Sequence, residues 1–79
     1  MGTMGTRASR WEEPFPYQGG QVTVARFADG WRIEVEGRQI EGKTLVGAFE
    51  AMLRRPAGNP ELDVVLAALA RDRAKGTSD

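Results

Sequence analysis

Eight consecutive residues in the middle of the chain have the spacing of a phosphate-binding loop. The segment Gly37-Arg-Gln-Ile-Glu-Gly42-Lys43-Thr44 matches the pattern G-x-x-x-x-G-K-[ST], and it lies between a predicted strand and a predicted helix. In such a loop, backbone N–H groups surround phosphate oxygens, the lysine reaches the outer phosphates, and the hydroxyl binds Mg²⁺. The pattern makes Gly42, Lys43 and Thr44 a candidate anion site at the start of the helix.

Over these eight residues the chain resembles the P-loop NTPases, and the flanking sequence departs from that family. The preceding segment, Trp31–Glu36, alternates apolar and charged residues, which is typical of a half-exposed antiparallel strand. The residues after Thr44 indicate two helices, so no second parallel strand completes a nucleotide-binding unit, and Glu41 puts a negative charge in the loop. We therefore prefer a structural interpretation, in which Gly37 turns a hairpin, Gly42 ends a strand and Thr44 caps a helix.

The amino-acid composition excludes most other kinds of catalytic site. The chain has no cysteine and no histidine, so it lacks disulfides, the usual zinc ligands and the usual general base at neutral pH. Its two serines, Ser9 and Ser78, fall in expected tails. We expect no catalytic residue, no cofactor and no metal site. The lack of cysteine is typical of a cytoplasmic protein.

The balance of charge restricts the class of partner. Eleven basic and eleven acidic residues give a net charge of zero, and both signs are mixed along the chain. Binding to nucleic acid through phosphates usually requires a basic surface, so this balance disfavours a nucleic-acid partner. No apolar run has the length of a transmembrane helix, and the N-terminus lacks the apolar core of a signal peptide. We expect no membrane partner.

The candidate residues are predicted to lie on one small α+β domain. Its expected architecture is a three-stranded antiparallel β-meander followed by two α-helices, in the order β-β-β-α-α. We place this domain at residues 21–75, with a flexible N-terminal arm at 1–20 and a polar tail at 76–79. A chain of this size has room for a single core.

The first two strands are predicted at Val22–Phe27 and Trp31–Glu36, joined by a two-residue turn at Asp29-Gly30. That turn pairs Val24 with Val35. It gathers most apolar residues of the hairpin on one face, namely Val22, Val24, Trp31, Ile33 and Val35. Arg26 is the exception on this face. A register shifted by one residue would turn Val22 and Val24 outward, and we prefer the first register.

A third strand and two helices complete the expected domain. Gly37 allows a turn into the strand Arg38–Glu41, with Ile40 opposite Ile33. Thr44 is the predicted N-cap of a helix that ends near Arg55. Its apolar stripe consists of Leu45, Ala48, Phe49, Met52 and Leu53. The second helix is capped by Asn59 and ends near Arg73, and its expected buried stripe is Leu62, Val65, Leu66 and Leu69.

The N-terminal segment from Trp11 to Tyr17 gathers three of the six aromatic residues of the chain around two prolines. Exposed aromatic side chains between prolines can anchor a chain on another protein, so Trp11, Phe15 and Tyr17 are candidate partner-binding residues. The alternative, which we favour, is that the segment folds back and covers the open face or an edge of the sheet.

The strand hairpin followed by Gly42-x-Thr44 and a helix is similar to the HicB-type antitoxin domains. The similarity covers Val22–Leu53 and is carried by Gly42, Thr44, Leu45 and Ala48. We take it as a similarity of topology, because the cysteine-bearing loop and the DNA-binding segment of that family have no counterpart here.

Together these features predict a non-catalytic binding or regulatory module that acts through protein–protein contacts, as a homodimer or as a subunit of a complex. Unpaired sheet edges and apolar surface left uncovered by two short helices both favour association. The alternatives are a small nucleic-acid-binding regulator and a nucleotide- or phosphate-binding protein that uses Gly37–Thr44.

Overall fold

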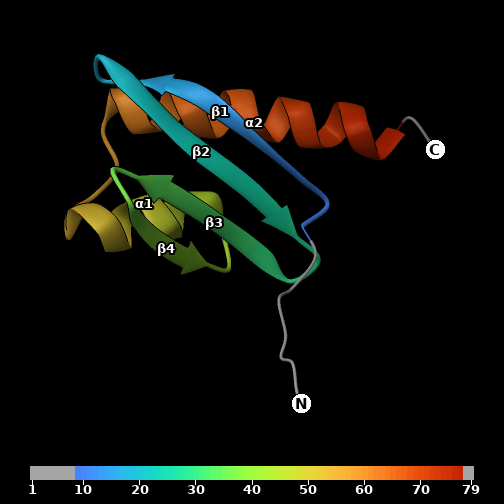
Figure 1. Ribbon diagram of the computed structural model, residues 1–79, viewed down its shortest axis with the longest axis horizontal. Coiled ribbons are helices and arrows are strands. Elements are labelled where there is room, and N and C mark those ends of the chain that lie inside the picture. Colours follow the sequence, from blue (N-terminus) through green and yellow to red (C-terminus); the bar gives the residue numbers. More distant parts are fainter. Residues whose placement is uncertain (1–8, 78–79) are drawn as a thin grey trace.

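Three two-residue turns fold the strands of this protein into one antiparallel sheet. The computed structural model describes residues 9–77. The strands are β1 (Trp11–Tyr17), β2 (Gly20–Phe27), β3 (Gly30–Val35) and β4 (Arg38–Gly42), and the helices are α1 (Leu45–Leu53) and α2 (Asn59–Thr77). The strands lie in the order β1-β2-β3-β4 (Figure 1).

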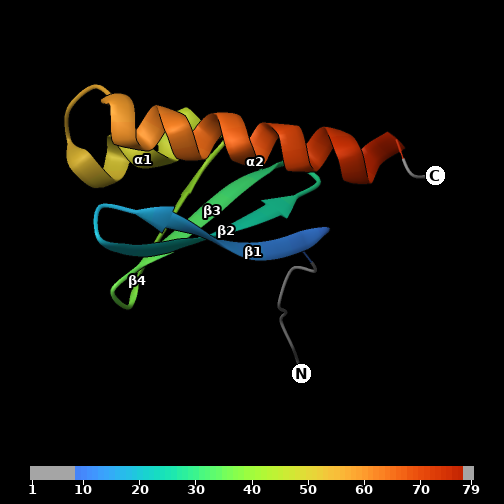
Figure 2. The ribbon, with the colours of Figure 1, turned by 90° about the horizontal axis from the view of Figure 1, so that it is seen from above.

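Both helices pack on the same face of the sheet (Figure 2). Helix α2 lies along β1, and α1 contacts β3 and β4. The core fills the space between the sheet and the helices. It contains Trp11, Phe15, Val22, Val24, Trp31, Ile33, Leu45, Ala48, Phe49, Val64, Val65 and Ala68.

The expected three strands are corrected to four, because Trp11–Tyr17 is a strand paired with β2. Composition placed this segment in a flexible arm on account of its prolines. Pro14 and Pro16 are two residues apart on an edge strand, and an edge strand tolerates proline where its nitrogen faces away from the sheet. The parts of the expected arm and tail at residues 1–8 and 78–79 lie outside the described residues.

The register between β2 and β3 differs from the expected one by two residues. Val24 pairs with Ile33 rather than with Val35, and the turn is Ala28-Asp29. A shift of two residues leaves every side chain on its predicted face, so the apolar face was predicted correctly. Gly30 belongs to β3 because it pairs with Phe27 of β2. A side chain would not fit at this position, since a Cβ there would lie 2.8 Å from the carbonyl oxygen of Gly42 on β4.

The turn between β3 and β4 was predicted correctly. Glu36 and Gly37 form it with φ angles of 52° and 81°, and Ile33 pairs with Ile40. The turn between β1 and β2 has the same character, with φ angles of 47° at Gln18 and 78° at Gly19. Positive φ at both central residues matches the twist of antiparallel hairpins, and glycine adopts it without steric cost.

Helix α1 follows its prediction closely. The Oγ1 atom of Thr44 accepts a hydrogen bond from the Gly47 N–H at 2.9 Å, as expected of an N-cap. Of its predicted stripe, Leu45, Ala48 and Phe49 are buried, and Met52 and Leu53 are half-buried. The helix ends at Leu53 because Arg54 adopts a left-handed conformation with φ of 58°.

Helix α2 is rotated about its axis relative to the prediction. The residues that face the sheet are Glu61, Val64, Val65 and Ala68. Only Val65 of the expected stripe is buried, whereas Leu62, Leu66 and Leu69 are 39%, 66% and 39% exposed. One physical reason for this rotation is the space beneath α2. The bulky Trp11 and Phe15 of β1 belong to the same core and leave room there for small side chains of the helix.

Replacement of Gly42 by alanine tests the close contact between β4 and α1. A Cβ at Gly42 would lie 2.9 Å from the Ala48 nitrogen and 3.1 Å from the Thr44 oxygen, which are backbone atoms that cannot rotate away. We expect Gly42→Ala to lower the free energy of unfolding by about 2 kcal/mol, measured by urea denaturation. The control is Gly20→Ala, whose Cβ would make only an ordinary 3.8 Å contact. Equal stability of the two variants would contradict the close packing.

Candidate functional site

The phosphate-binding pattern is distributed over three different structural elements. Gly37 lies in the hairpin turn, Arg38–Gly42 is strand β4, and Thr44 is the N-cap of α1. Successive N–H groups of an extended strand point to opposite sides, so those of β4 do not converge on one anion. The space beside the Gly42 Cα is occupied by the backbone of α1, since a Cβ there would lie 2.9 Å from the Ala48 nitrogen.

Of the candidate anion site, the structure leaves Lys43 exposed beside a shallow hollow of about 270 Å³. Asp29 and Glu41 line this hollow as well, and both bring negative charge toward any anion. The Thr44 hydroxyl oxygen accepts the Gly47 N–H as a helix cap. The geometry of Gly42 and Thr44 is thus accounted for by a strand-to-helix junction.

The aromatic segment forms part of the core. Trp11, Phe15 and Tyr17 occupy alternate positions of β1 on the side that faces α2, and Trp11 and Phe15 are only 7% and 9% exposed. Trp11 makes edge contacts with Phe15 and with Trp31, at ring distances of 6.3 Å and 5.9 Å. Use of these aromatic residues as a docking motif would require β1 to leave the sheet.

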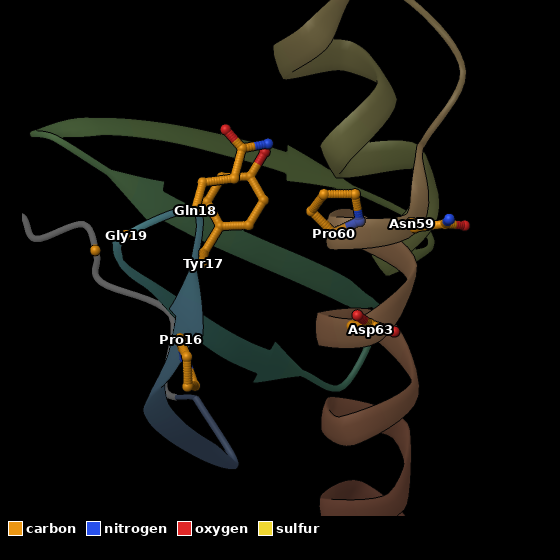
Figure 3. Close-up of a pocket in the computed structure, with 8 residues that line it drawn as sticks. Pro16, Tyr17, Gln18, Gly19, Asn59, Pro60 and Asp63 are labelled. Carbon is orange, nitrogen blue, oxygen red and sulfur yellow. The ribbon is translucent and has the colours of Figure 1, made fainter.

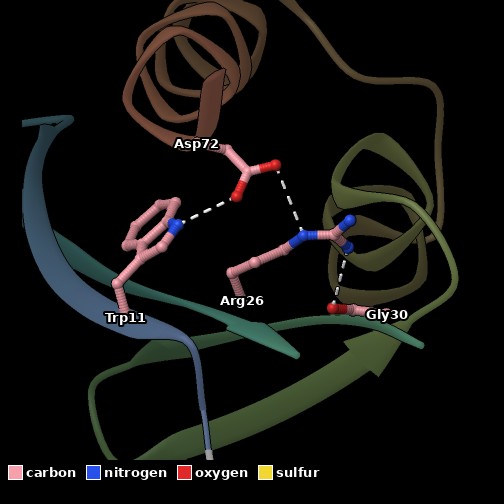
Figure 4. A network of polar contacts seen from close by, with 4 residues as sticks. All are labelled: Trp11, Arg26, Gly30 and Asp72. Carbon is pink, nitrogen blue, oxygen red and sulfur yellow. Dashed lines mark hydrogen bonds and ion pairs between the residues drawn. The ribbon is translucent and has the colours of Figure 1, made fainter. Parts of the chain in front are cut away.

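A polar network explains why Arg26 lies on the apolar face of the sheet (Figure 4). Asp72 of α2 accepts a hydrogen bond from the Trp11 indole at 3.0 Å, and its other oxygen lies 3.4 Å from the Arg26 Nε. The guanidinium of Arg26 also donates to the Gly30 carbonyl at 3.3 Å and lies 4.6 Å from the centre of the Trp31 ring. These contacts tie the C-terminal half of α2 to β1 and β2.

A second polar cluster holds the start of α2. Glu61 is fully buried, and its Oε1 accepts a hydrogen bond from the Gly58 N–H at 2.8 Å, as in a capping box. Its Oε2 accepts hydrogen bonds from the Tyr17 hydroxyl and from Gln18 Nε2, the latter at 3.2 Å. One carboxylate therefore connects the first turn of α2 to the turn between β1 and β2.

This cluster shifts the pKa of both ionisable partners. The hydrogen bond from the Tyr17 hydroxyl is the main cause that lowers the pKa of Glu61 from its ordinary value of 4.5, against the opposing effect of burial. Burial is the first cause that raises the pKa of Tyr17 to about 12, and the hydrogen bond to Glu61 raises it further. Glu61 is therefore a buried charge at neutral pH, and its hydrogen bonds compensate for the loss of water.

Beside this cluster lies an open hollow of about 500 Å³ between the β1–β2 turn and the start of α2 (Figure 3). Its lining is mainly apolar and includes Pro16, Tyr17 and Pro60, with Asp63 at one side. Glu61 is not among the lining residues, and its carboxylate oxygens are occupied by internal hydrogen bonds. The buried Glu61 carboxylate is therefore not presented to this hollow.

The surface that sequence reasoning missed is the side of α2 that points away from the sheet. We call it the outer face of α2, and it consists of Leu62, Asp63, Leu66, Ala67, Leu69, Ala70, Arg73 and Ala74, all of them exposed. Asp63 and Ala67 lie at its margin, because they also line hollows beside β1. Six of these eight side chains are leucine or alanine. The signal for this face was present in the sequence, since the helix has more apolar positions than one buried stripe can hold.

Comparison of the chain with protein families, curated proteins and solved structures finds no match. Neither helix of the described part of the chain has the length and apolar character needed to cross a membrane. Within residues 9–77, no group of three acidic side chains is placed to share a metal ion. The surfaces described above are therefore the features from which a function can be inferred.

Removal of the Tyr17 hydroxyl tests the buried carboxylate. Tyr17→Phe keeps the ring, which packs 5.7 Å from the Phe49 ring, and removes the hydrogen bond to Glu61. We therefore expect the free energy of unfolding at pH 7 to fall by about 2 kcal/mol. Because the folded-state pKa of Glu61 is lowered, this contribution is fully present above about pH 4.5 and is lost as pH falls through the folded pKa.

The measurement is thermal unfolding of wild type and Tyr17→Phe between pH 7 and pH 3. The difference in stability between the two proteins should become smaller as the pH falls. Glu61→Gln serves as the control, because it removes the titrating group and should flatten the acid limb of the stability curve. A difference that stays constant over this range would show that the hydroxyl does not act through the Glu61 charge.

Calorimetric titration of the chain with Mg-ATP and Mg-GTP tests the phosphate-binding pattern directly. We expect no saturable heat at micromolar nucleotide, because β4 is extended and the position beside the Gly42 Cα is filled. Micromolar binding that disappears in Lys43→Ala would overturn this expectation.

Proposed function

We propose that this protein is a non-catalytic interaction module that acts through protein–protein contacts made by the outer face of α2. The observation that supports this proposal is the exposure of Leu62, Leu66 and Leu69 on one side of a long helix. Single exposed leucines are common on protein surfaces, but a contiguous apolar helix face is the usual feature of a surface that binds another protein.

Charge supports a protein partner over nucleic acid. The outer face carries one acidic residue, Asp63, and one basic residue, Arg73, so it has no excess of positive charge for phosphates. The chain as a whole has zero net charge. A nucleic-acid-binding regulator, the alternative from the sequence, would require a basic surface that this face does not supply.

The sheet contributes less to association than the sequence suggested. Of its two edges, β1 carries Pro14 and Pro16, which provide no N–H group for an added strand. β4 has only five residues. The helix face therefore offers more surface to a partner than either edge of the sheet.

Acidic substitution on the outer face tests the proposed function. We expect Leu66→Asp to abolish association of the chain with itself or with a protein from its native host, measured by light scattering and by affinity capture. The matched control is Ala51→Asp on α1, which is also exposed and should leave association unchanged. The proposal fails if wild type stays monomeric at high micromolar concentration and no bound protein is recovered, or if a gel shift at low salt shows a nucleic-acid complex.

A further inference from the structure

Two hollows between β1 and α2 meet to form one groove, and this inference builds on the proposed function by naming the chemistry of the partner. The first hollow has a volume of about 500 Å³ and lies beside Tyr17 (Figure 3). The second has a volume of about 320 Å³ and lies beside Phe15 and Ala67. Pro16 and Asp63 line both hollows, so the two are continuous there. We call this surface the β1–α2 groove, and its principal lining residues are Phe15, Pro16, Tyr17, Pro60, Asp63 and Ala67.

The walls of the groove are apolar, and Asp63 is its charged side chain. Among the described residues that line the two hollows, none is basic. The adjoining edge of β1 carries Pro14 and Pro16, which have carbonyl oxygens but no N–H groups. At those two positions the edge can therefore accept hydrogen bonds and cannot donate them. Such a lining suits a ligand that brings hydrogen-bond donors and positive charge on an apolar stem.

The carboxylate of Asp63 differs from the other acidic groups along the boundary between β1 and α2. Glu13 forms ion pairs with two basic residues of α2, at 2.9 Å and 3.3 Å. Glu61 accepts hydrogen bonds from the β1–β2 turn, and Asp72 accepts one from the Trp11 indole at 3.0 Å. Asp63 is exposed, and no hydrogen bond or ion pair within residues 9–77 engages its carboxylate. The chain thus supplies partners to its neighbours and leaves Asp63 available to an external cation.

The start of α2 does not offset this negative charge. A helix start can attract anions through its unpaired N–H groups. Here the Gly58 N–H donates to Glu61 Oε1 at 2.8 Å, and Pro60 has no N–H group. Glu61 itself is ionised at neutral pH and adds a second negative charge two residues before Asp63. The electrostatic field near the groove therefore favours a cation over an anion.

We propose that the β1–α2 groove binds an extended segment of a partner protein through an arginine or lysine flanked by apolar residues. The charged end of the basic side chain pairs with Asp63, and its methylene stem lies on Pro16 and Pro60. In an extended segment, the residues two positions before and after the basic one point to the same side and span about 13 Å. Pro60 and Ala67 are about 10 Å apart along the helix axis, so one segment reaches both hollows. Because Asp63 lies at the margin of the outer face of α2, the same partner can contact that face.

Titration with the blocked pentapeptide acetyl-Leu-Ala-Arg-Ala-Leu-amide, followed by two-dimensional NMR of the labelled protein, tests this site. We expect saturable shifts confined to the amides around the groove, with a Kd on the order of 1 mM. The same peptide with citrulline in place of arginine keeps the shape and loses the charge, so its Kd should be at least about threefold higher. Equal binding of the two peptides would show that charge is not recognised and would overturn the proposal. Shifts located elsewhere, or none at several times this concentration, would overturn it as well.

Asp63→Asn tests the residue that carries the charge. The substitution keeps the size of an exposed side chain, and it should raise the Kd of the arginine peptide roughly three- to tenfold. It should also abolish the preference for arginine over citrulline, because that preference measures the interaction between the two charges. The matched control is Glu34→Gln, a carboxylate of β3 outside the groove, which should leave the Kd unchanged. An Asp63→Asn protein that still prefers arginine would overturn the proposed role of Asp63.

The outcomes separate this inference from the proposed function. Leu66 lines neither hollow, so Leu66→Asp should abolish association with a protein partner and leave the Kd of the pentapeptide unchanged. A partner that is lost in Leu66→Asp and binds Asp63→Asn as tightly as wild type would overturn the basic segment and leave the interaction module intact. Peptide binding without any associated protein would support the groove and overturn the outer face of α2 as the interaction surface. Absence of both would overturn both.

Discussion

The buried carboxylate of Glu61 is the interaction on which the arrangement of this protein depends most. A charged group without access to water is tolerated only when hydrogen bonds replace its hydration. Glu61 obtains them from Tyr17 and Gln18 at the β1–β2 turn and from Gly58 at the start of α2. The carboxylate must therefore point inward, and this requirement sets the rotation of α2 about its own axis.

The far half of α2 is held in the same rotation by polar contacts. Asp72 binds the Trp11 indole and approaches Arg26, and Glu13 of β1 forms ion pairs with Arg71 and Lys75 at 2.9 Å and 3.3 Å. Because polar contacts fix both ends of α2, the helix cannot rotate to bury its three exposed leucines. The apolar outer face is thus a consequence of polar contacts on the inner face, and it is the basis of the proposed interaction.

The junction between β4 and α1 illustrates how a motif can match in letters and differ in structure. Gly37, Gly42 and Thr44 each have a physical reason to be present: a positive φ in a turn, a close approach of two backbones, and a helix cap. The same three requirements arise in phosphate-binding loops, so the sequence pattern alone does not distinguish such a loop from a hairpin followed by a capped helix. The strand that precedes Gly37 does distinguish them. Its alternation of apolar and charged residues predicts an antiparallel partner and hence a hairpin turn at Gly37.

Local sequence determined the features that depend on near neighbours. These are the apolar face of the β2–β3 hairpin, the turn at Glu36-Gly37, the cap at Thr44 and the stripe of α1. Tertiary structure decided the rest. Proline-rich Trp11–Tyr17 becomes a strand because it has a partner in β2, and α2 buries Glu61 rather than Leu62 because Tyr17, far away in the chain, supplies the hydrogen bond. Helical periodicity shows that a helix has an apolar side, but only contacts from distant residues decide which side faces the core.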